Sequence, residues 1–414
     1  MSAPRLNRRL GTGDAVFIGL GSMIGAGVFS AIGPASAAAG RGVLLGLLVA
    51  AAVAYCNATA SAQLAAQYPT SGGTYVYGRE RLGEWWGFAA GWCFVIGKTA
   101  SCAAMALTFA SYVAPQHGWL RRLVALAAVV VLTWITTRGI TRTAALTRVL
   151  VTVTLAVLAV TVVVLLTGAG TAGPEPVEPK SGSGPYGVLQ AAGLMFFAFA
   201  GYARIATMGE EVRDPARTIP RAILLALGIT VLAYLGVAVA ALTAVGPTVL
   251  AQSPAPLAAA ATHAGAAWLV PALAAGAAVA SLGALLALLT GIGRTSLAMG
   301  RNRDLPALFA RVHPRHEVPH QAQLMVGAVV AVLVLLTDLR GVIGFSSFGV
   351  LLYYALANAS AFTQDREQRR WPRALNLLGL AGCLILVATL PPHTLLAGVL
   401  MLAVGLTGRR LLRG

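Results

Sequence analysis

Apolar stretches of membrane-spanning length recur from one end of this chain to the other. A helix needs roughly 20 predominantly apolar residues to cross the hydrocarbon core of a bilayer. Polar residues, prolines and glycines separate twelve apolar segments, a pattern that predicts an all-α integral membrane protein with about twelve transmembrane helices. The segments cover approximately residues 14-38, 42-66, 86-114, 122-137, 146-167, 187-209, 219-245, 266-299, 322-337, 342-361, 375-390 and 394-408.

The composition indicates lipid as the solvent. Of the 414 residues, 57% are hydrophobic and 10% are charged, and the mean hydropathy is +0.78, so polar side chains are too few to cover a water-soluble globule. The net charge of +17 does not indicate a nucleic-acid partner, because the basic residues lie in short loops and not on one face of a soluble module. We therefore expect membrane lipid around the protein and no nucleic acid.

The basic residues predict the orientation. Cytoplasmic loops of membrane proteins are enriched in Lys and Arg. With a cytoplasmic N-terminus, most of the 30 basic residues fall in inner loops and tails. Twelve crossings then return the C-terminus to the same side, which predicts a multi-pass protein of the cytoplasmic membrane with both termini cytoplasmic. The exceptions are Arg41, Arg121, Arg122, Lys180 and Arg340 in outer loops, and Lys98, Arg204 and Arg294 within segments.

Residues typical of metal sites and enzymes do not gather in this sequence. The cysteines fall inside apolar segments without ligand spacing, and the histidines lie in or beside loops. No nucleophile, acid–base pair or metal set converges within the segments. We therefore expect no metal, no cofactor and no enzymatic activity.

Glycines interrupt two of the segments near their middle. Gly19, Gly21, Gly25 and Gly27 crowd the first segment, and Gly201 follows small residues in the sixth. Glycine inside a helix costs about 1 kcal/mol relative to alanine and frees the backbone to unwind. Unwound backbone at membrane depth is tolerated only where it lines a polar cavity. The alternative is close helix packing, for which small residues four apart are also typical.

An interrupted helix offers both halves of an amino-acid site. Amides at the start of one half-helix suit a carboxylate, and carbonyls at the end of the other suit an ammonium group. The two interruptions therefore predict a binding site for a small amino-acid-like solute.

Four stretches in this chain resemble the amino acid-polyamine-organocation (APC) superfamily of permeases, which share the LeuT-type fold. GSMIGAGVF is similar to that family's glycine-rich first-helix motif, and YPTSGGTYVYGRERLGEWWGFAAGW to its loop between helices two and three. FFAFAGYARIATMGEEVRDPARTIPRAI resembles its broken sixth helix, and GRTSLAMGRNRDLP the end of its eighth. They occupy residues 21-29, 68-92, 196-223 and 293-306.

The resemblance implies ten helices in two inverted five-helix repeats, followed by two peripheral helices. The corresponding regions are a cytoplasmic tail at 1-13, the first repeat at 14-167, an outer loop at 168-186, the second repeat at 187-361, and helices 11 and 12 with the cytoplasmic tail at 362-414. The motif positions imply that the substrate contacts Met23, Ile24, Gly25, Ala26, Gly27, Phe197, Ala198, Phe199, Gly201 and Tyr202.

Five charged residues complete the predicted machinery. Intramembrane Lys98 and Arg204 are candidates for coupling, since ionisable residues at membrane depth are functional by default. The alternatives are that Lys98 pairs with a carbonyl and that Arg204 anchors an inner half-helix. Asp14, Glu210 and Glu211 are candidates for a cytoplasmic gate, although Asp14 also suits simple capping of the first helix.

These features predict a secondary active transporter that moves amino acids across the cytoplasmic membrane by alternating access. Relatives in the superfamily carry a lysine on helix five in place of sodium, and here the matching position is Thr154. No paired Ser/Thr sodium site is evident on helix eight, so we expect the proton as the coupling ion in symport. Exchange of amino acids or amines is the alternative, and a non-transporting membrane receptor is a third.

Overall fold

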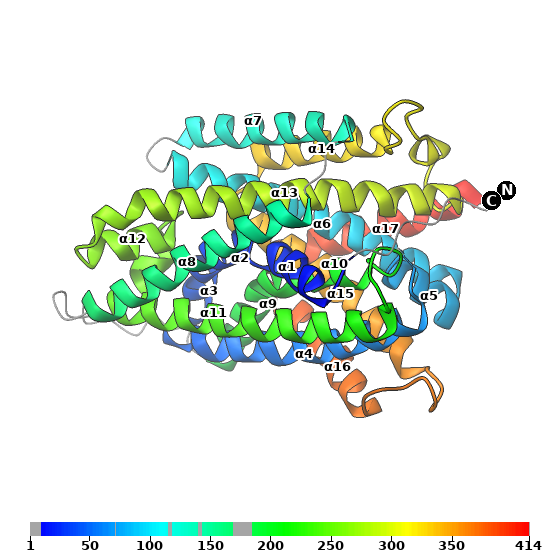
Figure 1. The fold of residues 1–414 in the computed structure, drawn as a ribbon, viewed down its shortest axis with the longest axis horizontal. Coiled ribbons are helices and arrows are strands. Elements are labelled where there is room, and N and C mark those ends of the chain that lie inside the picture. Colours follow the sequence, from blue (N-terminus) through cyan, green and yellow to red (C-terminus); the bar gives the residue numbers. More distant parts are fainter. Residues whose placement is uncertain (1–9, 71, 115–117, 140–142, 169–183, 414) are drawn as a thin grey trace.

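The computed structural model describes residues 10–70, 72–114, 118–139, 143–168 and 184–413, and these ranges fold into helices (Figure 1). Ten helical stretches within them are long and apolar enough to cross a membrane. The expected segments at 322-337 and 375-390 form two shorter apolar helices, so their crossing stays a prediction. The N-terminal tail before residue 10 and most of the expected outer loop at 168-186 lie outside the described residues.

The first half of the chain contains eight α-helices within the described ranges. They are α1 (Thr12–Met23), α2 (Ala26–Ser30), α3 (Ile32–Ala39), α4 (Val43–Gln67), α5 (Thr74–Leu82), α6 (Glu84–Val113), α7 (Gly118–Thr137) and α8 (Ala144–Gly168). A short 3-10 turn, Gly40–Gly42, joins α3 to α4.

The second half continues the helical arrangement. Its α-helices are α9 (Pro185–Phe199), α10 (Ala203–Ala206), α11 (Pro215–Gln252), α12 (Pro256–His263), α13 (Val270–Arg301), α14 (His320–Leu336), α15 (Leu339–Phe362), α16 (Arg373–Ala388) and α17 (Pro392–Arg413). Three 3-10 turns connect them: Ala200–Tyr202, Ala267–Leu269 and Ala307–Ala310.

Part of the loop expected between helices two and three is helical. Helix α5 lies within 68-92 and packs against α6 and α15. Gly73 and Gly83 flank it with φ of 56° and 104°, a left-handed backbone that glycine adopts without strain. The two glycines therefore bound a short helix that apolar periodicity does not reveal.

Small side chains form much of the protein interior. The buried faces of α4 and α6 are rich in alanine, glycine, serine and threonine, which let helix backbones approach closely. Large apolar side chains point outward instead, such as Trp134 on α7, Leu232 on α11 and Leu336 on α14. A surface of this kind suits lipid and not water.

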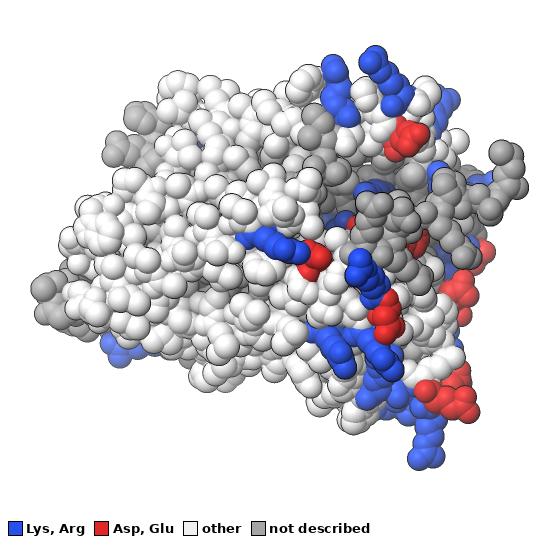
Figure 2. Space-filling model, viewed as in Figure 1, with Lys and Arg blue, Asp and Glu red and all other residues white. Residues whose placement is uncertain are grey.

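Charged side chains on the surface gather at one end of the helix bundle. Figure 2 shows Lys, Arg, Asp and Glu concentrated at the end where α5 lies and α17 ends in Figure 1, while the opposite end is nearly free of them on this face.

Helices from the two halves pack around a common centre. Helix α6 packs against α13 and α15, α4 against α9 and α11, and α7 against α14. Helix α1 contacts α8, α11 and the turn Ala200–Tyr202. Both interrupted segments are therefore held inside the bundle, where backbone irregularity is shielded from lipid.

Candidate functional site between two interrupted helices

The first transmembrane segment is interrupted where its glycines predict. Helix α1 ends at Met23 and α2 begins at Ala26. Between them, Ile24 has φ/ψ of −81°/61° and Gly25 has −102°/−133°, both outside the helical region. The amide of Ala26 lies 3.1 Å from the Met105 sulfur, a weak acceptor.

The sixth segment is interrupted more mildly. Helix α9 ends at Phe199, the chain tightens into the 3-10 turn Ala200–Tyr202, and α10 continues for one turn to Ala206. A 3-10 turn changes the hydrogen-bond ladder without extending the backbone. The single glycine of this segment thus accompanies a tightened turn and not the open stretch seen in the first segment.

The two interruptions touch. A Cβ on Gly201 would lie 2.3 Å from the carbonyl carbon of Ser22, and one on Gly27 would lie 2.5 Å from the Ala198 side chain. Neither position has room for a larger residue. Close packing, the alternative interpretation of these glycines, therefore accounts for Gly27 and Gly201, and the same contact brings the two unwound regions together.

A tyrosine from a third helix joins both interruptions. The Tyr234 hydroxyl of α11 lies 2.6 Å from the carbonyl oxygen of Met23 and 3.0 Å from that of Ala198. A third carbonyl, that of Ala200, accepts from Lys98 Nζ at 2.9 Å and from the Tyr354 hydroxyl at 3.2 Å. These donors satisfy carbonyls that the irregular backbone would leave bare at membrane depth.

Sequence reasoning identified Lys98 but missed both tyrosines. A buried tyrosine hydroxyl usually requires a partner, so a tyrosine inside an apolar helix was the available signal. That signal does not name the partner, because Tyr234 and Tyr354 lie far along the chain from the helix that each contacts.

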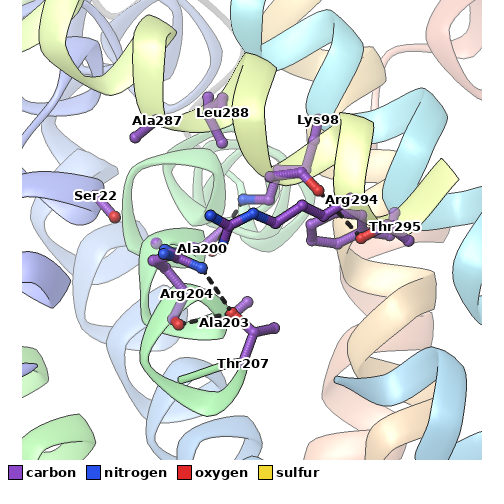
Figure 3. A pocket seen from close by; sticks show the side chains of 13 residues that line it. Ser22, Lys98, Ala200, Ala203, Arg204, Thr207, Ala287, Leu288, Arg294 and Thr295 are labelled. Atoms are coloured by element: carbon purple, nitrogen blue, oxygen red, sulfur yellow. Dashed lines mark hydrogen bonds between the residues drawn. The ribbon is translucent and has the colours of Figure 1, made fainter. Parts of the chain in front are cut away.

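A cavity of about 50 Å³ lies beside the interruptions, on the side of α10 and the C-terminal part of α13. A space of this size holds a few water molecules. In Figure 3 the side chains of Lys98, Arg204 and Arg294 converge on it from α6, α10 and α13. The remaining lining residues are Ser22, Phe94, Ala200, Gly201, Ala203, Thr207, Ala287, Leu288, Gly291 and Thr295.

Most of the predicted substrate residues pack beside the cavity and do not line it. Only Gly201 among them belongs to the wall. Gly25 and Gly27 are buried against neighbouring helices, with a Cβ on Gly25 falling 2.8 Å from the Ala284 side chain. The others are also buried: Met23, Ile24, Ala26, Phe197, Ala198, Phe199 and Tyr202. Their contact with substrate stays a prediction.

Both coupling candidates line the cavity, and a further arginine joins them. Arg294, which belongs to the stretch that resembles the end of the eighth helix, lies on the wall with Arg204. Both reach the same carboxylate oxygen, Oε1 of Glu211, at 3.5 and 3.6 Å respectively. Lys98 is buried at 6% exposure, and its ammonium group bonds the Ala200 carbonyl.

The three predicted gate carboxylates lie in different surroundings. Glu211 joins α13 to the end of the sixth segment through its two arginines. Asp14 instead pairs with Arg148 of α8 and accepts from the Gly11 amide at 3.2 Å, so it combines an ion pair with helix capping. Glu210 is exposed.

The backbone just before α1 pairs with the segment after α10 at this end of the site. The Leu10 amide donates to the Glu211 carbonyl at 3.2 Å, and the Arg213 amide donates to the Leu10 carbonyl at 2.9 Å. This short bridge ties the start of α1 to the segment that follows α10.

A larger cavity of about 570 Å³ opens at the opposite end of the bundle, and we call it the outer vestibule. Arg121 and Arg122 of α7 and Arg340 of α15 line it, together with one acidic residue, Asp338. Its other walls come from α3, α6, the end of α11 and the connection between α14 and α15. The interruptions thus lie between two cavities.

Within the described residues, no group of His, Cys, Asp and Glu side chains has the arrangement of a metal site. The rings of His313 and His316 lie 4.7 Å apart and that of His320 lies 5.0 Å from His313. Burial and the neighbouring cationic residues lower the pKa of His316.

Comparison with known proteins defines the class. The chain matches the amino acid permease family model over residues 10–405. It is 59% identical over 400 residues to an uncharacterized transporter of Mycobacterium tuberculosis H37Rv, covering 97% of this chain and 90% of that protein. It is 27% identical over 433 residues to the branched-chain amino acid permease BcaP of Bacillus subtilis, with coverage of 97% and 92%.

A third relative is the chloroplastic cationic amino acid transporter 7 of Arabidopsis thaliana, 29% identical over 388 residues, with 87% of this chain and 66% of that protein covered. Together with the apolar helices, these matches define a multi-pass membrane transporter. The chain belongs to the amino acid permease family, which confirms the resemblance to the APC superfamily.

Proposed function

We propose that this chain is a secondary active transporter that carries amino acids across the cytoplasmic membrane by alternating access, with a proton as the coupling ion. The observation that carries the proposal is the contact of two interrupted helices at the centre of the bundle, between a cavity on each side. Membership in the amino acid permease family supports the same class of substrate.

Helix packing supports an inverted repeat of the LeuT type. If helices one to five correspond to helices six to ten, each contact in one half should have a counterpart in the other. Helix α1 packs on α8 as α9 packs on α15, and α1 packs on α11 as α9 packs on α4. Likewise α6 contacts α15, α7 and α14, while α13 contacts α8, α14 and α7. These contacts correspond pair by pair when helices one to five are superposed on helices six to ten, as an inverted repeat requires.

The charge distribution supports cytoplasmic termini. Lys and Arg gather at the end of the bundle where α5 lies and α17 ends (Figures 1 and 2), and this is the end that the enrichment of basic residues in cytoplasmic loops assigns to the inside. On this assignment the 50 Å³ cavity faces the cytoplasm and the outer vestibule faces the exterior.

The first interruption supplies the substrate main-chain contacts in this proposal. The backbone at Ala31 is helical, so α2 and α3 form one continuous helical stretch. The amides at the start of α2 therefore lie at the N-terminus of that stretch. The Ala26 amide donates to the Met105 thioether, a weak acceptor, and can bond a carboxylate in its place at little cost. The Ala200 carbonyl accepts from the Lys98 ammonium, and the neighbouring carbonyls of this tightened turn suit the substrate ammonium group.

The contacts at the cytoplasmic end form the inner gate in this proposal. Glu211 with Arg204 and Arg294, and the backbone bridge between Leu10 and Val212, link α1, the sixth segment and α13. Access from the cytoplasm requires these contacts to separate, since they connect the helices that line the cavity. The ion pairs are partly exposed and long, so each contributes little and can break reversibly.

Lys98 is the coupling residue in this proposal. It joins α6 to the interruption of the sixth segment, so a change in its protonation alters a contact at the moving centre. A buried ammonium at membrane depth is costly unless it is paired or hydrated, which makes its protonation responsive to substrate and gate.

Purified protein in proteoliposomes tests the proposal. Labelled amino acids should accumulate when an inward proton gradient is imposed, and the gradient should be consumed during uptake. Uptake that requires an amino acid inside the vesicles and ignores the gradient would instead establish exchange. Absence of uptake for every amino acid and amine, in vesicles where the folded protein is verified, would contradict transport of this class.

A further inference from the structure

Both cavities on the two sides of the interruptions are lined by an excess of positive charge. Lys98, Arg204 and Arg294 line the inner cavity, and the described residues of its wall include no acidic side chain. Among the described residues, Glu211 is the carboxylate that pairs with Arg204 and Arg294, while the Lys98 ammonium donates to the Ala200 carbonyl. Two of the three cations thus share one carboxylate beside the cavity.

The geometry of this carboxylate leaves much of the guanidinium hydrogen-bonding capacity unused. A charge-assisted N–H···O bond spans about 2.7–2.9 Å, whereas Arg204 and Arg294 lie 3.6 and 3.5 Å from Glu211 Oε1. Arg204 also donates to the Thr207 hydroxyl at 3.3 Å. Each guanidinium has five N–H donors in a planar fork that matches a carboxylate. The two guanidinium groups therefore retain N–H donors for a carboxylate that approaches them more closely than Glu211 does.

The outer vestibule repeats the charge pattern with different residues. Arg121, Arg122 and Arg340 line it with one acid, Asp338, whose side chain accepts from the Gly341 amide at the start of α15. The enrichment of Lys and Arg in cytoplasmic loops predicts few basic residues at an outer surface. A cleft lined by one sign of charge concentrates solutes of the other sign and accelerates their entry.

We propose that the carried amino acid has a carboxylate side chain and a net negative charge, and that Arg204 and Arg294 hold this side chain in the inner cavity. The proposal rests on the transport function proposed above. The α-carboxylate and ammonium groups occupy the interruption, and the second carboxylate extends between the two guanidinium groups beside Lys98. A cationic amino acid would meet three like charges at the same position.

Glutamate and glutamine give the sharpest test, because they have nearly the same size and differ in side-chain charge. Uptake of each is measured in proteoliposomes with the membrane potential held at zero, so that substrate charge does not alter the driving force. The wild-type protein should favour glutamate over glutamine by about tenfold or more in kcat/KM. A wild-type protein that prefers glutamine, leucine or lysine overturns the proposal.

The double variant Arg204→Gln/Arg294→Gln should reduce this preference to within about threefold, because it removes both guanidinium groups. The ratio of two substrates on one preparation does not depend on how much protein folds. Arg217→Gln is the matched control, since Arg217 is 78% exposed at its side chain, pairs with Asp214 and lies outside the cavity wall. A preference that survives the double variant contradicts the role of the two arginines.

The vestibule is tested separately with Arg121→Gln/Arg340→Gln. Glutamate uptake should slow at low ionic strength while glutamine uptake is unchanged, and added salt should remove the difference from wild type. Equal effects on both substrates contradict electrostatic attraction by the vestibule.

The possible failures are distinguishable. Uptake of neutral or cationic amino acids without a glutamate preference refutes this proposal and leaves amino-acid transport intact. No uptake of glutamate, glutamine, leucine or lysine by folded protein refutes both.

Discussion

A buried ion cluster beside the C-terminal end of α13 offers a strong test of the fold. Asp304 follows α13, and its side chain is fully buried with that of Arg409 from α17. Asp304 Oδ1 accepts from Arg409 Nε at 2.8 Å, and Oδ2 accepts from Arg79 at 3.0 Å and from the Tyr75 hydroxyl at 2.7 Å. Burial, together with this bond to Asp304, raises the pKa of Tyr75, so the phenol remains a donor.

Asp304→Asn should destabilise the protein strongly. The amide keeps the shape but removes the charge, and Arg409 then remains buried over the rings of Trp85 and Phe88, 4.2 and 5.1 Å away. Removing one member of a buried ion pair costs about 3–5 kcal/mol. An unfolding entropy of roughly 2.1 cal/mol/K per residue, applied to 414 residues, converts this cost to a fall in Tm of roughly 3–6 °C.

Thermal unfolding in detergent, followed by tryptophan fluorescence, measures the change. Asp365→Asn is the matched control, because Asp365 is 76% exposed at its side chain and pairs with Arg81 at 3.6 Å. An exposed pair contributes about 0–1 kcal/mol, so this Tm should change by about 1 °C or less. Adding Arg409→Met to Asp304→Asn should recover part of the loss, since it removes a buried charge that has lost its partner at 2.8 Å and keeps only the longer contact with Glu84 at 3.5 Å among the described pairs. Equal Tm values for Asp304→Asn and wild type would refute the reasoning.

Three further perturbations address the centre of the bundle. Lys98→Ala should abolish uptake or uncouple it from the proton gradient while the protein still elutes as a folded monodisperse species, and wild-type rate and pH dependence would rule out the coupling role. Tyr234→Phe leaves two backbone carbonyls without their donor and should cost about 1–3 kcal/mol in thermal unfolding, whereas Tyr55→Phe at the exposed surface of α4 should be neutral. Gly201→Ala forces a Cβ against the backbone of the first interrupted helix and should cost about 1–3 kcal/mol. The control Gly228→Ala, with no described atom outside its own helix within 4 Å of its Cβ, should be neutral or stabilising. Equal Tm values for the two alanine variants would contradict the close contact between the interrupted helices.

Local properties of the sequence determined the membrane class and the position of the first interruption. Runs of apolar residues require lipid, and glycines around Gly25 unwind the helix where they stand, because both effects act within a few residues. The motif resemblance identified the family in the same way, from stretches that are contiguous in the chain. Two of the three charged residues that line the 50 Å³ cavity were also evident, since Lys98 and Arg204 are unusual in apolar segments.

Tertiary structure alone decided which groups meet. Tyr234 bridges two carbonyls from different segments. Arg294, which the sequence shows only as part of a motif, lines the cavity beside Arg204. Asp304 and Arg409, 105 positions apart, form a buried ion pair. The sequence around either residue does not indicate this pairing. Hydropathy and backbone preference depend on near neighbours, whereas ion pairs, hydrogen bonds and cavities depend on how distant helices pack against one another.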